Sequence, residues 1–350
     1  MIKKALSPFL FLLLLSCSSS NTTEIEPNKK ARWITEAFNT IAAGDYPQVK
    51  AVSWWHENFT GTYLRVDSSP QSIEAYRDAI ASPVFISETM IENEKLIAPS
   101  GNKVYHAAYP DFGGTEDIVT DERIYYFEDL VQKELAWAYF SNNWIDEIVF
   151  PTQAVNTILS TGKIPFIRLM ARSNFNEDQA DPVYSMQRII DGDFDSELTQ
   201  WAIDAANTNT SLLAEFGTEV NGSWFPWNGV YNGGATTTNY GDPNLPDGPE
   251  RFRDAYRHII DICRNNGATN ITWFFHVDAE GQPDEDWNKI ANYYPGDNYI
   301  DWLGASVYGN HFQDEDYIEF SDKLDLIYPN LVNLTQKPIA ILEFAITELE

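Results

Sequence analysis

Cysteine and positive charge are the scarce components of this 350-residue chain. There are only 2 cysteines, too few for a scaffold held together by disulfides. The 23 lysines and arginines stand against 52 aspartates and glutamates, which gives a net charge of −29. A surface of that sign repels phosphate backbones, so nucleic acid is not an expected partner. The 5 histidines show no metal-ligand spacing, so no zinc site is proposed. No cofactor is expected, and a structural calcium ion is left open.

The first residues resemble an export signal. Lys3 and Lys4 precede an apolar run over residues 5–15, broken only by a serine and a proline. That run is too short for a permanent membrane-spanning helix. Residues 1–16 are therefore predicted to be a signal peptide.

A lipid anchor is predicted directly after this signal. The sequence Leu-Leu-Ser-Cys at 14–17 resembles a bacterial lipobox. This implies that the mature chain carries lipid on Cys17 and continues as a polar tether over residues 17–29. The expected location is the bacterial cell envelope, at the outer membrane or the cell surface, with ordinary secretion as the alternative.

Residues 30–350 alternate between β-rich runs and amphipathic helical stretches. Hydrophobic residues make up 43% of the chain, enough for a large core. Strands that alternate with helices pair in parallel, and eight such units predict one (β/α)8 TIM-barrel domain. A doubly wound open sheet is disfavoured because no glycine-rich phosphate-binding loop follows a strand. The predicted strands are residues 49–55, 104–109, 135–140, 164–170, 212–218, 271–277, 300–308 and 338–344.

Two glutamates lie near the ends of predicted strands. Glu343 interrupts an otherwise apolar run over residues 339–344, where a charge is costly unless it is paired or functional. Glu219 follows another strand, at the rim where barrel enzymes perform chemistry. Glu215 lies deeper and is expected to pair with Arg168 as a structural contact. Two carboxylates at one rim suit glycoside cleavage, while a buried ion pair is the alternative for Glu343.

Three segments resemble glycoside hydrolase family 26. They are Glu-Val-Asn-Gly-Ser-Trp-Phe at 219–225, Tyr-Pro-Gly-Asp-Asn-Tyr-Ile-Asp-Trp-Leu-Gly at 294–304 and Lys-Pro-Ile-Ala-Ile-Leu-Glu-Phe at 337–344. The family contains β-mannanases, some β-1,3-xylanases and mixed-linkage glucanases, and belongs to a clan of retaining barrels. The resemblance implies Glu219 as acid/base on strand four and Glu343 as nucleophile on strand seven, with Tyr308 hydrogen-bonded to the nucleophile.

Two departures from the family pattern follow from the same comparison. Mannanases of the family usually carry histidine before the acid/base, where this chain has Thr218, so mannan is in doubt as substrate. A family member also continues past the nucleophile strand with an eighth strand, whereas here that strand resembles residues 46–55. A circular permutation is therefore inferred, with residues 83–103 as the new connector. A truncated gene, the alternative, leaves the front segment unexplained.

Aromatic and polar residues at the expected rim form a predicted substrate-binding set. Aromatic rings can stack on sugars, although packing of long loops is the alternative for each tryptophan. The resulting hypothesis is a monomeric, lipid-anchored retaining endo-β-glycanase acting on a β-mannan-like polysaccharide, β-1,3-xylan or mixed-linkage β-glucan. A non-catalytic surface glycan-binding lipoprotein is the rival. The predicted binding residues are Trp54, Trp55, Asn143, Trp144, Asn221, Trp224, Trp227, His276 and Tyr308.

Overall fold

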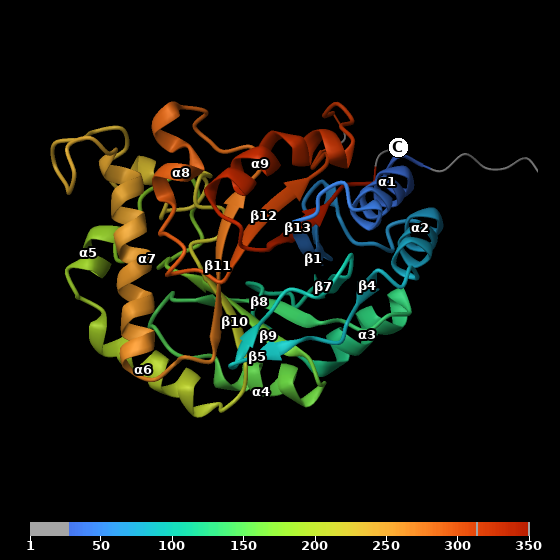
Figure 1. The fold of residues 1–350 in the computed structure, drawn as a ribbon, viewed down its shortest axis with the longest axis horizontal. Coiled ribbons are helices and arrows are strands. Elements are labelled where there is room, and N and C mark those ends of the chain that lie inside the picture. The colour runs from blue at the N-terminus through green and yellow to red at the C-terminus, as the bar shows by residue number, and fades with distance from the viewer. Residues whose placement is uncertain (1–27, 313, 349–350) are drawn as a thin grey trace, which may run out of the picture.

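Eight parallel strands close into a barrel in the computed structural model, which describes residues 28–312 and 314–348 (Figure 1). Neighbouring strands follow the order β1-β13-β12-β11-β10-β9-β8-β7, and β1 pairs with β7 to close the ring. The predicted (β/α)8 fold is therefore confirmed. The strands are β1 (Val49–Trp55), β7 (Val104–Tyr109), β8 (Trp137–Asn143), β9 (Ile164–Met170), β10 (Leu212–Phe216), β11 (Ile271–Asp278), β12 (Trp302–Tyr308) and β13 (Ile339–Ala345).

Helices surround the strands on the outside of the barrel (Figure 1). Side-chain caps set the starts of several of them: Asn28, Ser69 and Thr120 each accept a backbone N–H of the first turn. The helices are α1 (Lys29–Ala43), α2 (Pro70–Ile80), α3 (Asp121–Val131), α4 (Thr152–Ser160), α5 (Met186–Ile190), α6 (Asp195–Asn207), α7 (Asp247–Asn265), α8 (Ile290–Tyr293) and α9 (Phe320–Leu334).

The first and last strands of the chain are neighbours. β1 lies between β13 and β7, with Val52 opposite Ile341 on one side and His106 on the other. Counted from β7, β10 is the fourth strand and β13 is the seventh. This is the arrangement that a circular permutation predicts, and the permutation itself stays a prediction.

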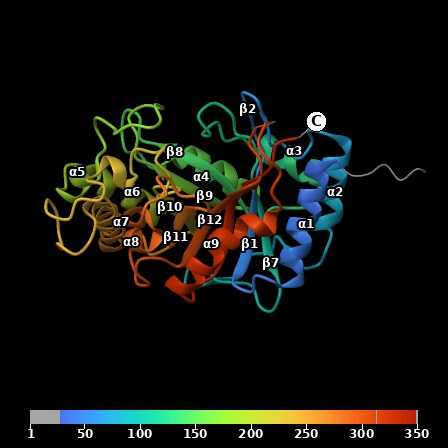
Figure 2. The ribbon, with the colours of Figure 1, turned by 90° about the horizontal axis from the view of Figure 1, so that it is seen from above.

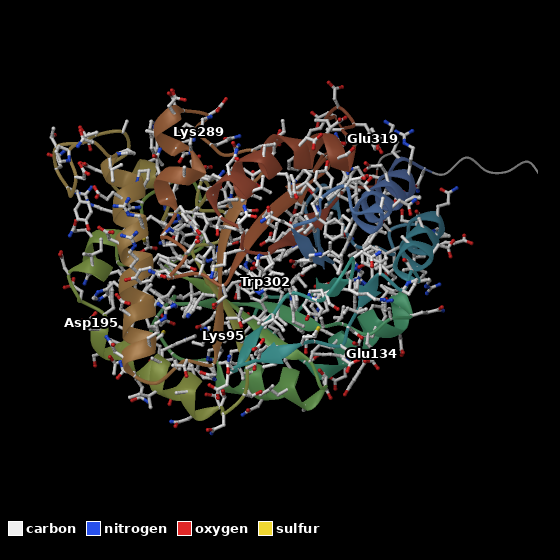
Figure 3. The ribbon with its side chains drawn as sticks, in the orientation of Figure 1. Lys95, Glu134, Asp195, Lys289, Trp302 and Glu319 are labelled. Atoms are coloured by element: carbon white, nitrogen blue, oxygen red, sulfur yellow. The ribbon has the colours of Figure 1, made fainter. Side chains whose placement is uncertain are left out.

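The predicted connector crosses the end of the barrel where the strands begin. It contains the short strands β4 (Phe85–Ile86), β5 (Ile91–Glu92) and β6 (Lys95–Leu96). Leu96 N donates to Thr272 Oγ1 at 2.8 Å, and Trp302 Nε1 donates to Leu96 O at 3.0 Å. Lys95 and Trp302 are labelled in Figure 3. The connector therefore covers the bottom of the barrel and leaves the opposite rim open.

The opposite rim carries the hairpin formed by β2 (Asn58–Phe59) and β3 (Thr62–Tyr63), which follows β1 and projects at the top of Figure 2. Strand ends and the long loops after them meet on this side. Within the described residues, no helix combines the length and apolar character needed to cross a membrane. The predicted signal peptide, Cys17 and nearly all of the tether lie outside the described residues.

Candidate active site

A cavity of about 840 Å³ opens at the carboxyl ends of the strands. Side chains from β1, β9, β11, β12 and β13 line it, together with side chains from the segments after β1, β7, β9, β10, β11 and β12. This is the face at which barrel enzymes place their chemistry. The predicted residues that the structure brings together here are Trp55, Glu219, Trp224, Tyr308 and Glu343.

Glu343 points into this cavity from β13 and is 5% exposed. The Tyr308 hydroxyl donates to its Oε2 at 2.9 Å, as predicted. Arg168 Nη2 lies 3.1 Å from its Oε1. A cation and a hydroxyl donor aimed at one carboxylate favour its ionised form.

Glu219 follows β10 after a sharp change of backbone direction. Gly217 and Glu219 have φ of 67° and 49°, so both lie in the left-handed region, and the strand ends at Phe216. Glycine is required at position 217, because a Cβ there would lie 2.5 Å from Phe252 Cε2. The alternation of side chains along the strand, from which the direction of Glu219 was predicted, therefore stops before this residue. The turn that follows Phe216 directs the Glu219 side chain into the cavity.

The two glutamates differ in their charged partners. Burial and, to a smaller extent, the nearby Asp278 carboxylate together raise the pKa of Glu219 to about 7. Burial also raises the pKa of Glu343 to about 7, but Arg168 opposes that rise. Trp224 Nε1 donates to Glu219 Oε2 at 2.7 Å, yet no cation of the described residues forms an ion pair with Glu219. These contacts favour the protonated form at Glu219 and the ionised form at Glu343 when only one of the two is ionised.

Beneath these two residues lies a buried polar network. Arg168 Nε is 3.5 Å from Glu215 Oε1, so the predicted pair of Glu215 and Arg168 is confirmed. Glu215 Oε2 is 2.8 Å from Nδ1 of His276, and Nε2 of the same ring is 2.9 Å from Ser306 Oγ. His276 is fully buried and does not line the cavity, so its predicted contact with substrate is corrected.

The prediction that three tryptophans stack on sugar is also wrong, because their indoles are fully buried and do not line the cavity. Trp54 alternates with Trp55 and points outward, where it packs on Phe344 with ring centroids 5.0 Å apart. Trp144 lies against Tyr184 and Phe216. Trp227 donates Nε1 to Thr218 O at 2.7 Å.

The two predicted asparagines position neighbouring segments and do not line the cavity. Asn143 donates to Thr115 O at 2.8 Å and accepts from Arg172 Nε at 2.8 Å. Asn221 accepts from Asp278 N at 2.8 Å and donates to Asp278 O at 2.9 Å. Their predicted role in binding sugar directly is therefore not supported by these contacts.

Several cavity residues escape the sequence argument. Arg168 was readable as an inward partner of Glu215, but not as a partner of Glu343. Most of the others lie on loops, where no periodicity shows which side chains converge, while Phe59 lies in β2 and Lys323 in α9. They include Phe59, Glu116, Arg172, Phe225, Phe312 and Lys323.

A parallel barrel with two carboxyl groups in the cavity at its rim suits a glycoside hydrolase. Residues 180–344 match the model of glycosyl hydrolase family 26. The matched range contains all three motifs, which confirms the resemblance drawn from them.

Individual relatives resemble the chain in part. Endoglucanase H of Acetivibrio thermocellus is 30% identical over 174 residues, which are 47% of this chain and 17% of that protein. The chain thus spans about a sixth of that curated relative. GH26A from Muricauda sp. MAR_2010_75 is 18% identical, with a TM-score of 0.42 over 63% of this chain and 71% of that one. The GH26 domain of an endo-β-mannanase/endo-β-glucanase from Prevotella bryantii is 16% identical, with a TM-score of 0.43 over 65% and 73%.

Proposed function

We propose that this protein is a retaining endo-β-glycanase with β-glucan as its preferred substrate. The observation that carries the proposal is the pairing of Glu343, which contacts Arg168 and Tyr308, with a more weakly partnered Glu219 in one cavity. The contacts of Glu343 with Arg168 and Tyr308 favour the carboxylate that a nucleophile needs, and Asp278 favours the protonated form that an acid needs at Glu219.

The proposed reaction has two steps. In the first, Glu343 attacks the anomeric carbon while Glu219 gives its proton to the glycosidic oxygen, so the carbon–oxygen bond breaks and a glycosyl ester forms. In the second, Glu219 takes a proton from water, whose oxygen displaces Glu343 from the anomeric carbon. Two inversions leave the product with the configuration of the substrate.

The preference for glucan rests on two observations. The relative with 30% identity over 174 residues bears the name Endoglucanase H. Thr218 stands where mannanases of the family usually have histidine, and its hydroxyl is engaged by His276 Nδ1 at 2.7 Å. We therefore rank mixed-linkage β-glucan above β-1,3-xylan and mannan.

Incubation with a panel of polysaccharides tests this proposal. Lichenan, laminarin, β-1,3-xylan and mannan are each treated with the enzyme, and new reducing ends are measured. Proton NMR of the first product then reports the anomeric configuration. We expect lichenan to be cleaved fastest, into oligosaccharides with retained configuration. Binding to these polymers without cleavage of any would instead favour the rival, a non-catalytic glycan-binding protein.

Arg172 is expected to bind substrate away from the cleaved bond. It lines the cavity, its Nε is held by Asn143, and among the described residues it forms no ion pair. Its guanidinium lies 4.6 Å from the ring centroid of Phe175, and burial lowers its pKa to about 10. The remaining N–H donors suit a pair of sugar hydroxyls. We therefore expect Arg172→Ala to raise KM about 10-fold and leave kcat within about threefold.

Steady-state kinetics on the best substrate of the panel measures this effect. Arg188→Ala is the matched control, since Arg188 pairs with Asp193 at 2.6 Å outside the cavity. A loss of kcat at unchanged KM in Arg172→Ala would contradict a role in substrate binding.

The lipid anchor is a further proposal, supported by the lipobox-like residues 14–17. Replacing Cys17 with serine removes the thiol that lipid would modify. We expect the variant to leave the membrane fraction and retain its activity in solution. Fractionation followed by immunoblotting measures this, and membrane retention of the variant at the level of the natural chain would contradict the anchor.

A further inference from the structure

We infer that Trp227 and Asn228 form a clamp that fixes the direction of Glu219 by holding the main-chain carbonyls of the residues before and after it. Both are positioning residues, because neither lines the cavity. The inference rests on the proposed function, in which Glu219 is the acid/base, and adds the contacts that hold this proton donor in place.

The clamp consists of two side-chain N–H donors from consecutive residues. Trp227 Nε1 donates to Thr218 O at 2.7 Å. Asn228 Nδ2 donates to Val220 O at 2.9 Å. All four residues are fully buried. Because Thr218 O belongs to the planar peptide group that joins Thr218 to Glu219, its hydrogen bond restrains the φ angle of Glu219.

The backbone at this turn has a conformation that needs such support. Glu219 has a φ of 49°, in the left-handed region that residues with a Cβ rarely adopt. A conformation of this kind persists where the surrounding contacts hold it. The Trp227 indole also packs against the start of the turn, since a Cβ added at Gly217 would lie 3.2 Å from Trp227 Cδ1.

The two donors are themselves held in place. The Trp227 ring stacks on Phe225, with ring centroids 4.5 Å apart and an interplanar angle of 18°. Asn228 Oδ1 accepts Val230 N at 2.9 Å at the start of the 3-10 helix Gly229–Tyr231. Since the amide oxygen of Asn228 faces this N–H, its amide nitrogen faces the Val220 carbonyl. The clamp is therefore fixed before substrate binds.

Two main-chain hydrogen bonds complete the frame around the acid/base. Gly222 N donates to Glu219 O at 2.8 Å, and Val220 N donates to His276 O on β11 at 3.2 Å. Neither bond involves Thr218 O, for which Trp227 supplies the donor. The peptide group directly before Glu219 is therefore the part of the turn that depends on the clamp.

A positioning role makes a prediction that general stabilisation does not. A misplacement of about 1 Å at a reacting group can slow a reaction about 10²-fold. Loss of either donor should let the Glu219 carboxyl group move away from the glycosidic oxygen. The damage should then be confined to reactions that need the proton of Glu219.

The test compares two substrates in two variants of the whole protein. Trp227→Phe removes the indole N–H and keeps an aromatic ring, and Asn228→Ala removes the second donor. We expect each to lower kcat on the best polysaccharide of the panel about 10- to 100-fold. A dinitrophenyl glycoside releases its aglycone without protonation, so single-turnover release of dinitrophenol should stay within about threefold of the natural rate.

Matched controls make the same chemical changes at the bottom of the barrel. Trp302 Nε1 donates to Leu96 O at 3.0 Å, and Asn270 Nδ2 donates to Thr210 O at 2.7 Å. Both control residues are buried, at 1% and 4% exposure. Trp302→Phe and Asn270→Ala should lower the unfolding temperature and leave both rates near the natural values.

Two kinetic outcomes overturn the clamp. One is an unchanged kcat on polysaccharide in the folded variants. The other is an equal loss on both substrates, which would indicate general damage to the site. Thermal unfolding checks folding, and Asn228→Ala decides the matter should Trp227→Phe fail to fold.

A carbon-13 NMR titration keeps the clamp testable if every polysaccharide of the panel proves inert, a result that would count against the proposed function alone. The Glu219 Cδ signal is assigned with Glu219→Gln. Burial raises the pKa of Glu219 to about 7, and the charged groups beside it, Asp278 and His276, stay in place in both variants. A released carboxyl group reaches water, so its midpoint should fall by at least about half a pH unit in Trp227→Phe. An unchanged midpoint in both folded variants would overturn the clamp.

Discussion

Replacement of Glu343 by glutamine is expected to lower kcat by about 10⁴-fold or more on every substrate that the protein cleaves. Glutamine preserves the size of the side chain and removes the oxygen nucleophile. Among residues 28–312 and 314–348, no other carboxylate is held by both Arg168 Nη2 and the Tyr308 hydroxyl, so none is placed to substitute for it. Reducing-end release at enzyme concentrations up to micromolar measures the loss. Retention of a tenth of the natural activity would disprove the assignment.

A matched control separates this chemical effect from general destabilisation. Glu250 of α7 is also 5% exposed, accepts the backbone N–H of Asp242 and pairs with Arg253 at 2.9 Å. It does not line the cavity. Glu250→Gln should therefore lower the unfolding temperature and leave kcat near the natural value. Glu343→Gln should instead lower kcat and leave the unfolding temperature near the natural value.

The barrel and its two glutamates could be predicted because their signals are local. A run rich in β-forming residues predicts a strand from its composition alone. A glutamate inside an apolar run, as in β13, is unusual wherever in the fold the strand lies. Boundaries were less accurate. The strand expected at 135–140 is Trp137–Asn143, since Leu135 and Ala136 are buried but precede the paired residues.

The binding residues were harder to predict because a side chain's direction depends on its neighbours. Trp54 and Trp55 have the same composition signal, yet one faces the helices and the other the cavity. Trp144 and Trp227 belong to long loops, and their rings stack on Phe216 and Phe225 inside the protein. Arg172 and Phe312 carry no sequence signal, since a lone residue of either type is usually structural. Which loop side chains meet in the cavity depends on the three-dimensional fold, and a single sequence does not reveal it.

Removal of the Glu219 side chain should give a different defect, one that depends on the leaving group. Glu219→Ala leaves no proton donor, so cleavage of polysaccharide should fall by about 10²–10⁴-fold. A dinitrophenyl glycoside needs no protonation when its aglycone departs. The first step should therefore stay fast on that substrate, and the glycosyl ester on Glu343 should accumulate because no base activates water. A rapid burst of dinitrophenol followed by slow turnover would report this state.

Reactivation by azide shows which of the two catalytic glutamates a variant lacks. Glu219 lines the cavity, so its truncation leaves space for a small anion beside the glycosyl ester. Azide is nucleophilic without a general base, and should restore turnover of the dinitrophenyl glycoside at least about tenfold, yielding a glycosyl azide of β configuration. In Glu343→Ala, azide can attack only the anomeric carbon of the substrate itself, so its product should be the α azide. The stereochemistry of the azide product thus distinguishes acid/base from nucleophile, and a β azide from Glu343→Ala would require the two roles to be exchanged.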